Sequence, residues 1–599
     1  MNGFWRLNQK VSCWINQSWP RSGLFKLHKS YLIPLLFIHS SGWTVPAQGQ
    51  RIMVSGPSPH VVEVAQRVTE RGGNVADVAV AIGLTLSVTS PYYAALGGGG
   101  FALIKMDEKV RVLDFREVAP KATGPDYYLN LPEGSSQLGG TAVAVPGIPM
   151  GLWELHQKYG QLRWAALFDY PLRLANQGFR VSGEWSEMTE RAYQDFSEGG
   201  KQHFTKVRRN SEATPEDLYG PGEVLRQRAL GQALRMFRRQ GPRGFYQGAV
   251  ARDIVRAVKE TGGQLSLEDL EQYRVRWLEP MVAEFQGHTV YLMPPPSSGG
   301  LVIKTALHLM ESLKLPDLAP LSHQELHLLG EIMSRSFRGR ALLADPDFHS
   351  NPLEALLSSE YLKSLKNSID PNRARSLEPL SEDFGQKARS EEAGAPGDRG
   401  SEFLFAEATN TTHYSVMDQE GRAIAVTVTL NGNYGSKVVS PRYGIALNNE
   451  MDDFTTRPGE PNMFGLVQGT GNRVTPGKRP LSSMSPTLVE KDGQVIMAIG
   501  SPGGPRIISG VLQVLYRSLV TGLDIDQAIQ FPRIHHQFLP NTLFVEPHRL
   551  PPESLEALRK KGHDLREVGG GRVYAVRLRE DGRLEGAHDL RGEGASGGF

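Results

Sequence analysis

The feature that most limits how this 599-residue chain can fold is an abrupt change of pattern near residue 411. Glu391–Gly400 has no apolar period and is rich in turn formers, which is typical of a flexible, exposed segment. Thr411–Met417 and Arg422–Leu430 follow, both rich in β-forming residues, with Asp418–Gly421 as the turn between them. The pattern predicts a core hairpin directly after an accessible segment. A precursor cut at this point needs that arrangement, and an ordinary interdomain linker also has it.

The rest of the chain alternates between helical and strand patterns. Ser58 and Pro59 predict the start of a helix, and Asn74 predicts the cap of a second, almost wholly apolar helix that Pro91 stops. A helix that is apolar on most sides is buried. We expect strands at Phe101–Met106 and Val110–Phe115, and helices near Met150–Gly160, Gly222–Gly241 and Ser322–Ala344. Such a mixture predicts a layered α/β architecture.

The amino-acid composition argues against some classes of protein function. Hydrophobic residues make up 40% and charged residues 22%, as in soluble globular proteins. A formal net charge of +2 gives no reason to expect a nucleic-acid surface. The only cysteine is Cys13, so a chain processed beyond it has neither a disulfide nor a catalytic thiol.

The N-terminus has the pattern of an export signal. Residues 1–50 contain no Asp or Glu. Within this stretch a short apolar run at Tyr31–Ile38 is followed by small residues around Val45–Gly49. The run is short and contains Pro34, whereas a spanning helix needs about 20 apolar residues. We therefore expect residues 1–49 to be a signal peptide with its flanking segment, and the mature protein to be periplasmic or extracellular. An uncleaved anchor close to the membrane is the alternative.

Several familiar active-site and ligand-binding motifs occur in the sequence without the neighbouring residues or elements that such sites require. Gly594–Gly598 matches the G-x-S-x-G nucleophile elbow, but no helix can follow it before Phe599. His323 and His327 are four residues apart without a third metal ligand, and His535-His536 suits packing or hydrogen bonding. Gly97–Gly100 lacks the Lys-Ser/Thr of a P-loop and predicts a turn or a close backbone approach.

A stronger signal is a series of dense polar and glycine-rich motifs. Taken singly, each is ordinary turn or cap chemistry. In chain order they are Gly97–Phe101, Asp114–Pro120, Pro294–Gly300, Asn410–Ser415, Thr427–Gly432, Asn448–Phe454, Arg479–Pro486 and Gly500–Arg506. Together, from about Val54 to the C-terminus, they resemble the γ-glutamyltranspeptidase family, the glutathione hydrolases.

The resemblance implies a fold and a processing event. The implied fold is the four-layer αββα sandwich of the N-terminal-nucleophile hydrolases. Cleavage after Asn410 exposes Thr411, so residues 50–410 form a large subunit that ends in a flexible segment at about 367–408. Residues 411–599 form the small, catalytic subunit, and the two fragments stay together as a heterodimer.

The resemblance also assigns the catalytic residues. Thr411 is the implied nucleophile, and its new α-amino group, with an ordinary pKa of about 7.7–8.0, serves as the base. Thr429 matches the threonine that orients it. Gly503 and Gly504 match the oxyanion-hole glycines, whose backbone N–H groups approach the substrate closely.

The remaining matches suit a free α-amino acid head group. Arg116 matches the arginine that clamps the α-carboxylate, a task shared with Ser482 and Ser483. Asn431, Glu450 and Asp453 match the residues that receive the α-ammonium, with glutamine in some members at the position of Glu450. Phe464 occupies the place of an aromatic lid residue. A cation at one end and two carboxylates at the other are expected to select a zwitterion.

We therefore expect hydrolysis or transfer of γ-glutamyl groups from glutathione and related compounds to water, amino acids or dipeptides. No cofactor, metal, nucleic acid or stable membrane span is implied. A related self-processing acylase acting on glutaryl-type amides is a close alternative, although a glutaryl group has no ammonium for Glu450 and Asp453. A processed but inactive binding homologue is the third interpretation.

Overall fold

Two β-sheets organise the chain in the computed structural model, which describes residues 46–207, 214–381 and 411–599. Within these residues each sheet has seven strands. The β10 sheet runs β19 (Ala595–Gly598), β2 (Ile52–Gly56), β10 (Thr411–Asp418), β11 (Ala423–Thr429), β3 (Gly99–Lys105), β4 (Val110–Phe115), β7 (Arg276–Leu278). The β13 sheet runs β1 (Ala47–Gly49), β18 (Leu584–His588), β17 (Tyr574–Leu578), β13 (Gln494–Gly500), β12 (Thr487–Lys491), β9 (His288–Leu292), β8 (Met281–Phe285).

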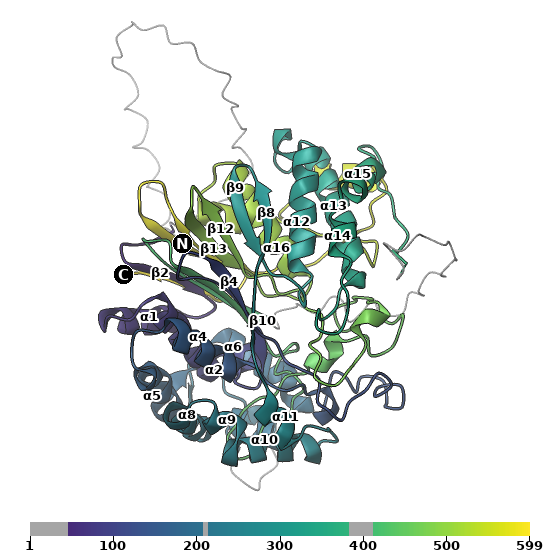
Figure 1. Ribbon diagram of the computed structural model, residues 1–599. Helices are drawn as coiled ribbons and strands as arrows, with labels where there is room; N and C mark the ends of the chain where they lie inside the picture. The colour runs from purple at the N-terminus through teal and green to yellow at the C-terminus, as the bar shows by residue number, and fades with distance from the viewer. Residues whose placement is uncertain (1–45, 208–213, 382–410) are drawn as a thin grey trace, which may run out of the picture. The chain divides into compact units, whose positions relative to one another are not determined.

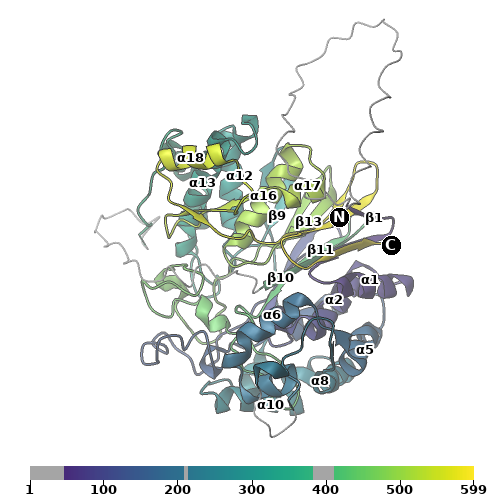
Figure 2. The ribbon, with the colours of Figure 1, turned by 180° about the vertical axis from the view of Figure 1, so that it is seen from behind.

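Helices cover the outer face of each sheet (Figures 1 and 2). On the side of the β10 sheet, α1 (Pro59–Glu70), α2 (Val75–Thr89) and α4 (Ile148–Tyr159) lie against its strands. Behind them α5 (Asp169–Gln177) packs on α2, α8 (Arg228–Gln240) packs on α5, and α10 (Gly248–Glu260) lies further from the sheet. The layer against the β13 sheet contains α12 (Gly299–Ser312), α13 (His323–Arg338), α16 (Arg506–Val520) and α17 (Ile525–Gln530). The layers therefore follow the order helix, sheet, sheet, helix, as the sequence resemblance implied.

Shorter elements complete the described chain. The other α-helices are α3 (Pro91–Ala94), α6 (Gly183–Ala192), α7 (Glu198–Phe204), α9 (Arg243–Tyr246), α11 (Leu267–Gln272), α14 (Leu353–Leu356), α15 (Ser359–Ser368) and α18 (Pro552–Lys560). The small sheets contain β5 (Phe179–Arg180), β6 (Val224–Leu225), β14 (Ile534–His535), β15 (Leu543–Val545) and β16 (Leu565–Glu567). Among the helices described, none is long and apolar enough to cross a bilayer.

The core consists of three large apolar layers and two smaller clusters. One lies between the two sheets and includes Leu103, Met417 and Leu488, while two larger ones lie between each sheet and its helices. Alternate residues of a strand point to opposite faces. On β10, Tyr414 and Val416 belong to the helix-side core and Met417 to the layer between the sheets. Thr411 has the parity of Met417, so its side chain faces the space between the sheets.

Local sequence signals fix the first helices as expected. Ser58 caps α1 by accepting a hydrogen bond from the His60 amide at 3.3 Å. Asn74 and Asp77 form a reciprocal capping box at the start of α2, and every residue of that helix is buried. The predicted helix over Gly222–Gly241 is shorter than expected, because β6 occupies its first residues and α8 begins only at Arg228.

The predicted hairpin is confirmed at the centre of the β10 sheet. Thr411 pairs with Thr429 and Met417 with Ala423, and the register is unbroken between them. β10 also pairs with β2, and β11 with β3. The hairpin from the C-terminal part of the chain therefore lies between β2 and β3, which come from the N-terminal part. Asn410 and most of the flexible segment predicted at about 367–408 lie outside the described residues, while the first two residues of that segment form the end of α15.

The glycine-rich patterns take the roles that their context predicted. A Cβ atom at Gly97 would lie 2.1 Å from the Ala446 carbonyl oxygen, and one at Gly98 would lie 2.0 Å from that of Thr429. Side chains here would prevent the backbones from approaching, as the interpretation of Gly97–Gly100 requires. Ala595–Gly598 forms edge strand β19 beside β2, not the strand–turn–helix of a nucleophile elbow. Most of the predicted signal lies outside the described residues, although Ala47–Gly49 already pairs with β18.

Candidate active site

Thr411 and Thr429 form a buried hydroxyl pair at one end of the central hairpin. Their Oγ1 atoms share a hydrogen bond of 3.1 Å. The Asn431 amide N–H donates to Thr429 Oγ1 at 2.8 Å. Since Thr429 accepts this bond, its own hydroxyl hydrogen can be directed at Thr411. The pairing holds the Thr411 oxygen in one place and leaves its proton available to a base.

Gly503 and Gly504 lie in the turn between β13 and α16, and both have positive φ, at 120° and 55°. This conformation favours glycine over any residue with a side chain. Neither amide N–H donates a hydrogen bond within the described chain. Two adjacent, unengaged N–H groups in such a turn can serve as an anion-binding concavity.

Arg116 is the centre of a buried charge cluster. It follows β4, and its guanidinium bonds to Glu450 through Nη1 and to Asp453 through Nη2, the latter at 2.6 Å. Its Nε donates to the Pro480 carbonyl at 3.4 Å. Burial alone would lower the pKa of Arg116, but the carboxylates of Glu450 and Asp453 raise it overall. The expected separation of cation and carboxylates into two ends is therefore not seen, because the predicted binding residues are in direct contact here.

Glu117 is a member of this cluster that sequence reasoning missed. It is fully buried, and its Oε2 lies 3.7 Å from Arg116 Nη1. Neither of its carboxyl oxygens has a hydrogen-bond partner among the described residues. Burial raises the pKa of Glu117 to about 7 against the opposing charge of Arg116, and burial also raises the pKa of Glu450. Its place in the Asp114–Pro120 motif was the only signal in the sequence.

The predicted lid segment connects the charge cluster to the glycine pair. Asn462 Nδ2 donates to Asp453 Oδ1 at 3.0 Å, a contact that the sequence did not predict. Two residues further on, the half-buried Phe464 ring lies against Gly504, where a Cβ would be 2.7 Å from the ring. The segment therefore packs on both the glycine turn and the carboxylate of Asp453.

The other predicted binding residues border the same cluster. Asn431 Nδ2 donates to the carbonyl of Asn449, the residue before Glu450. Ser482 lies two residues after Pro480, with its amide bonded to the Pro296 carbonyl at 2.7 Å. Ser483 is buried beside it. The structure thus brings together residues between 116 and 504 of the sequence.

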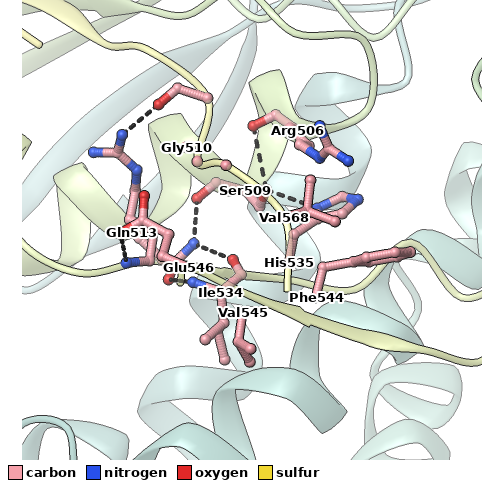
Figure 3. Close-up of a pocket in the computed structure, with 14 residues that line it drawn as sticks. Arg506, Ser509, Gly510, Gln513, Ile534, His535, Phe544, Val545, Glu546 and Val568 are labelled. Carbon is pink, nitrogen blue, oxygen red and sulfur yellow. Dashed lines mark hydrogen bonds between the residues drawn. The ribbon is translucent and has the colours of Figure 1, made fainter. Parts of the chain in front are cut away.

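A separate cleft of about 20 Å³ lies against the first turns of α16. Its lining includes Arg506, Ser509, His535 and Phe544, and Ser509 bonds to the His535 ring (Figure 3). None of the predicted site residues lines it. The space is enough for about one water-sized group.

Of the two histidines weighed as metal ligands, His327 has structural partners, whereas His323 Nδ1 has no hydrogen-bond partner among the described residues. His327 bonds to the His563 ring and to the Asp370 carbonyl, both at 2.7 Å. His535 bonds to Ser509 and Gln537. Over the residues that the structure describes, no cluster of three His, Cys, Asp or Glu side chains could hold a metal.

The sandwich of two sheets between two helix layers, with a hydroxyl residue opening a central strand, is the fold of the N-terminal-nucleophile hydrolases. A cephalosporin acylase from Bacillus halodurans shares this fold, with a TM-score of 0.78 and 23% identity over 96% of this chain and 99% of that one.

Sequence comparisons then identify the family. The γ-glutamyltranspeptidase family profile matches residues 62–599. A glutathione hydrolase proenzyme of Pseudomonas aeruginosa is 37% identical over 557 residues, which cover 90% of this chain and 93% of the relative. The γ-glutamyltranspeptidase structure from Helicobacter pylori is 31% identical, with a TM-score of 0.52 over 56% of this chain and 96% of that one. The chain belongs to the γ-glutamyltranspeptidase family.

Proposed function

We propose that this protein is a self-processing enzyme that cleaves γ-glutamyl amides such as glutathione and passes the γ-glutamyl group to water or to an amino acid or dipeptide. The observation that carries the proposal is the buried Thr411 hydroxyl, which opens β10 and is bonded to Thr429. Relatives named glutathione hydrolase proenzyme support the same conclusion.

Processing takes place between Asn410 and Thr411 and leaves fragments of about residues 50–410 and 411–599. Both fragments contribute strands to the β10 sheet, in which β10 lies beside β2, and β11 beside β3. Separating the fragments would break both ladders and expose the apolar layers on either face of the sheet. The processed protein is therefore a heterodimer. Residues 1–49 direct export to the periplasm or the medium.

The reaction runs through an ester of Thr411. The free α-amino group of Thr411 takes the hydroxyl proton as Oγ1 attacks the γ-carbonyl carbon. The N–H groups of Gly503 and Gly504 hold the oxyanion. The C–N bond then breaks, and the amine leaves with the proton from the α-ammonium group. Water or an acceptor amine attacks the ester by the same steps in reverse, which releases glutamate or a new γ-glutamyl compound.

Selectivity comes from the charge cluster. The α-ammonium group of the substrate is received by Asp453 and Glu450, and the α-carboxylate by the cationic side of the cluster with Ser482 and Ser483. These carboxylates also argue against glutaryl amides, because a glutaryl group would leave them facing no ammonium.

The test compares release of p-nitroaniline from γ-glutamyl-p-nitroanilide and from glutaryl-p-nitroanilide. We expect a kcat/KM for the γ-glutamyl compound about 10- to 100-fold higher, since hydrogen bonds from the ammonium group to these carboxylates contribute about 1.5–3 kcal/mol. Equal rates, or a preference for the glutaryl compound, would favour the acylase alternative. No release from either would favour the inactive homologue. Thr411→Ala serves as the blank.

A further inference from the structure

The outer helices on the side of the β10 sheet carry a concentration of arginine without matching acidic residues. Residues 224–252, which include α8, α9 and the start of α10, contain seven arginines and no Asp, Glu or Lys. Over residues 46–599 the acidic residues outnumber the basic ones by three, so this excess of positive charge is local. A local positive field on a nearly neutral chain orients the molecule toward a negatively charged surface.

The exposed face of α8 is a row of arginines. Arg228, Arg235 and Arg239 are exposed and are spaced by seven and then four residues, which places them on one face of the helix. The opposite face buries Leu234 and Phe237. Arg228 and Arg239 make no hydrogen bond or ion pair with any described residue. This arginine row therefore presents guanidinium groups to the solvent, and two of them have no partner.

An apolar groove of about 130 Å³ lies beside the arginine row, between α1 and α5. Its floor consists of Val64, Val68, Leu162, Ala166 and Leu167. Three exposed arginines, Arg67, Arg71 and Arg173, line its rim. Figures 1 and 2 show α1, α5 and α8 in succession along the outside of the molecule. The groove and the arginine row therefore belong to one continuous surface.

Contacts at the rim connect the groove to α8 and leave cations available. Asp169 is paired with Arg71 at 2.9 Å and with Arg238 of α8 at 3.2 Å. The other two rim arginines lie over the Tyr170 ring, with their Cζ atoms 5.3 Å and 4.9 Å from its centroid. Glu63 is bonded to the Tyr170 hydroxyl at 2.6 Å. Because a ring attracts a cation without accepting all its N–H groups, these two guanidinium groups keep donors for a ligand.

We propose that the arginine row and the groove form a surface that binds an anionic phospholipid bilayer. Lipid phosphates fit the planar fork of arginine through paired hydrogen bonds. The apolar floor suits the level at which headgroups meet acyl chains. A nucleic acid offers the phosphates without an apolar layer, so the groove favours lipid. The association is peripheral, since no described helix can cross a bilayer. This inference goes beyond the proposed function and does not depend on it.

The test is co-sedimentation of the purified protein with lipid vesicles. One set contains about 30% phosphatidylglycerol in phosphatidylcholine and the other phosphatidylcholine alone, each at about 0.1 M and about 0.5 M NaCl. The variant combines Arg173→Gln, Arg228→Gln and Arg239→Gln, side chains that bond to no described residue. The matched control combines Lys363→Gln, Lys366→Gln and Arg559→Gln, which removes three exposed charges from α15 and α18 in the other helix layer.

We expect the wild type to bind the phosphatidylglycerol vesicles at the lower salt concentration, to be released at the higher one, and to leave neutral vesicles unbound. Each arginine near an anionic surface contributes about fivefold in affinity, so the triple arginine variant should bind about 100-fold more weakly. The control should stay within about threefold of wild type, as for charges distant from the lipid. Circular dichroism and the rate on γ-glutamyl-p-nitroanilide should not change in either variant.

A wild-type protein that does not bind phosphatidylglycerol vesicles, or binds neutral vesicles equally well, would overturn the inference. Equal weakening in the two triple variants would also overturn it, because it would assign the effect to net charge and not to this surface. Binding to a single-stranded oligonucleotide without binding to vesicles would assign the arginines to another polyanion and overturn it as well. None of these results measures catalysis, so each leaves the proposed function intact.

Discussion

Replacing Thr429 with valine removes one hydroxyl and nearly no volume, so it isolates the hydrogen bonds of that oxygen. The wild-type oxygen accepts from the Asn431 amide at 2.8 Å and is bonded to Thr411 Oγ1 at 3.1 Å. Valine leaves the buried amide unsatisfied, which costs about 1–3 kcal/mol, and removes a bond that contributes about 1 kcal/mol. We therefore expect Thr429→Val to lower the free energy of unfolding by about 2–4 kcal/mol.

Thr429→Val is also expected to lower kcat, because it affects the position of the nucleophile Thr411. If Thr429 holds Thr411 Oγ1 in place, its replacement raises the activation free energy by about 1.4 kcal/mol, which slows kcat about tenfold. Thr429→Ser keeps the hydroxyl, so its kcat should stay within about twofold of wild type. Thr427→Val is the matched control, because this residue has the same parity on β11 and bonds to the His413 ring at 2.8 Å. It should lose stability without losing rate.

The assays are kcat for γ-glutamyl-p-nitroanilide, the rate of fragment appearance on denaturing gels, and thermal unfolding by circular dichroism. A Thr429→Val protein with wild-type kcat and wild-type processing would refute the reasoning. Equal losses of kcat in the serine and valine variants would refute it too, because serine keeps the hydroxyl that valine lacks.

Three further predictions follow from the geometry. Asp453→Asn removes a charge that Arg116 contacts at 2.6 Å, so steady-state kinetics should show KM for γ-glutamyl-p-nitroanilide raised about 10- to 100-fold; an unchanged KM would contradict the assigned role. Gly504→Ala forces a side chain into a residue with φ of 55° and a Cβ into the Phe464 ring, so kcat should fall at least about 100-fold while circular dichroism shows a folded protein. Burial lowers the pKa of His413 to about 3, far below its unfolded value of about 6.5. The unfolded state therefore binds more protons below about pH 6.5, and the free energy of unfolding decreases as pH falls. Burial lowers the pKa of His535 to about 3 as well, whereas it raises the pKa of Asp452 to about 6, which offsets part of the effect. The measured Tm should therefore fall between about pH 7 and pH 4, and a rise would contradict the burial argument.

The sequence predicted those elements that depend on interactions between residues close together in the chain. The Ser58 and Asn74 caps, the hairpin at 411–429 and the close approach at Gly97–Gly100 each depend on residue type over a few positions. The layered architecture follows from those elements. The αββα order did not follow from them, and only the resemblance to a family implied it.

The candidate site was predictable as a set of residues and not as a geometry. Motifs named Arg116 and Glu450, yet their pairing joins positions 334 residues apart and depends on packing of the whole β10 sheet. Asn462 has no motif to mark it. Its significance is a partly buried hydrogen bond to Asp453, which can be recognised only when the fold is known.

The most direct test of the central claim is the intact mass of the purified protein under denaturing conditions, measured beside Thr411→Ala. We predict two fragments in the wild type, the smaller of which spans residues 411–599 and begins with Thr411 on N-terminal sequencing, and one uncut chain in the variant. Brief reaction with γ-glutamyl-p-nitroanilide before quenching should add one glutamyl group to the smaller fragment alone. A folded wild-type protein that stays whole, or a cut at any other position, would contradict the assignment of Thr411 as the nucleophile.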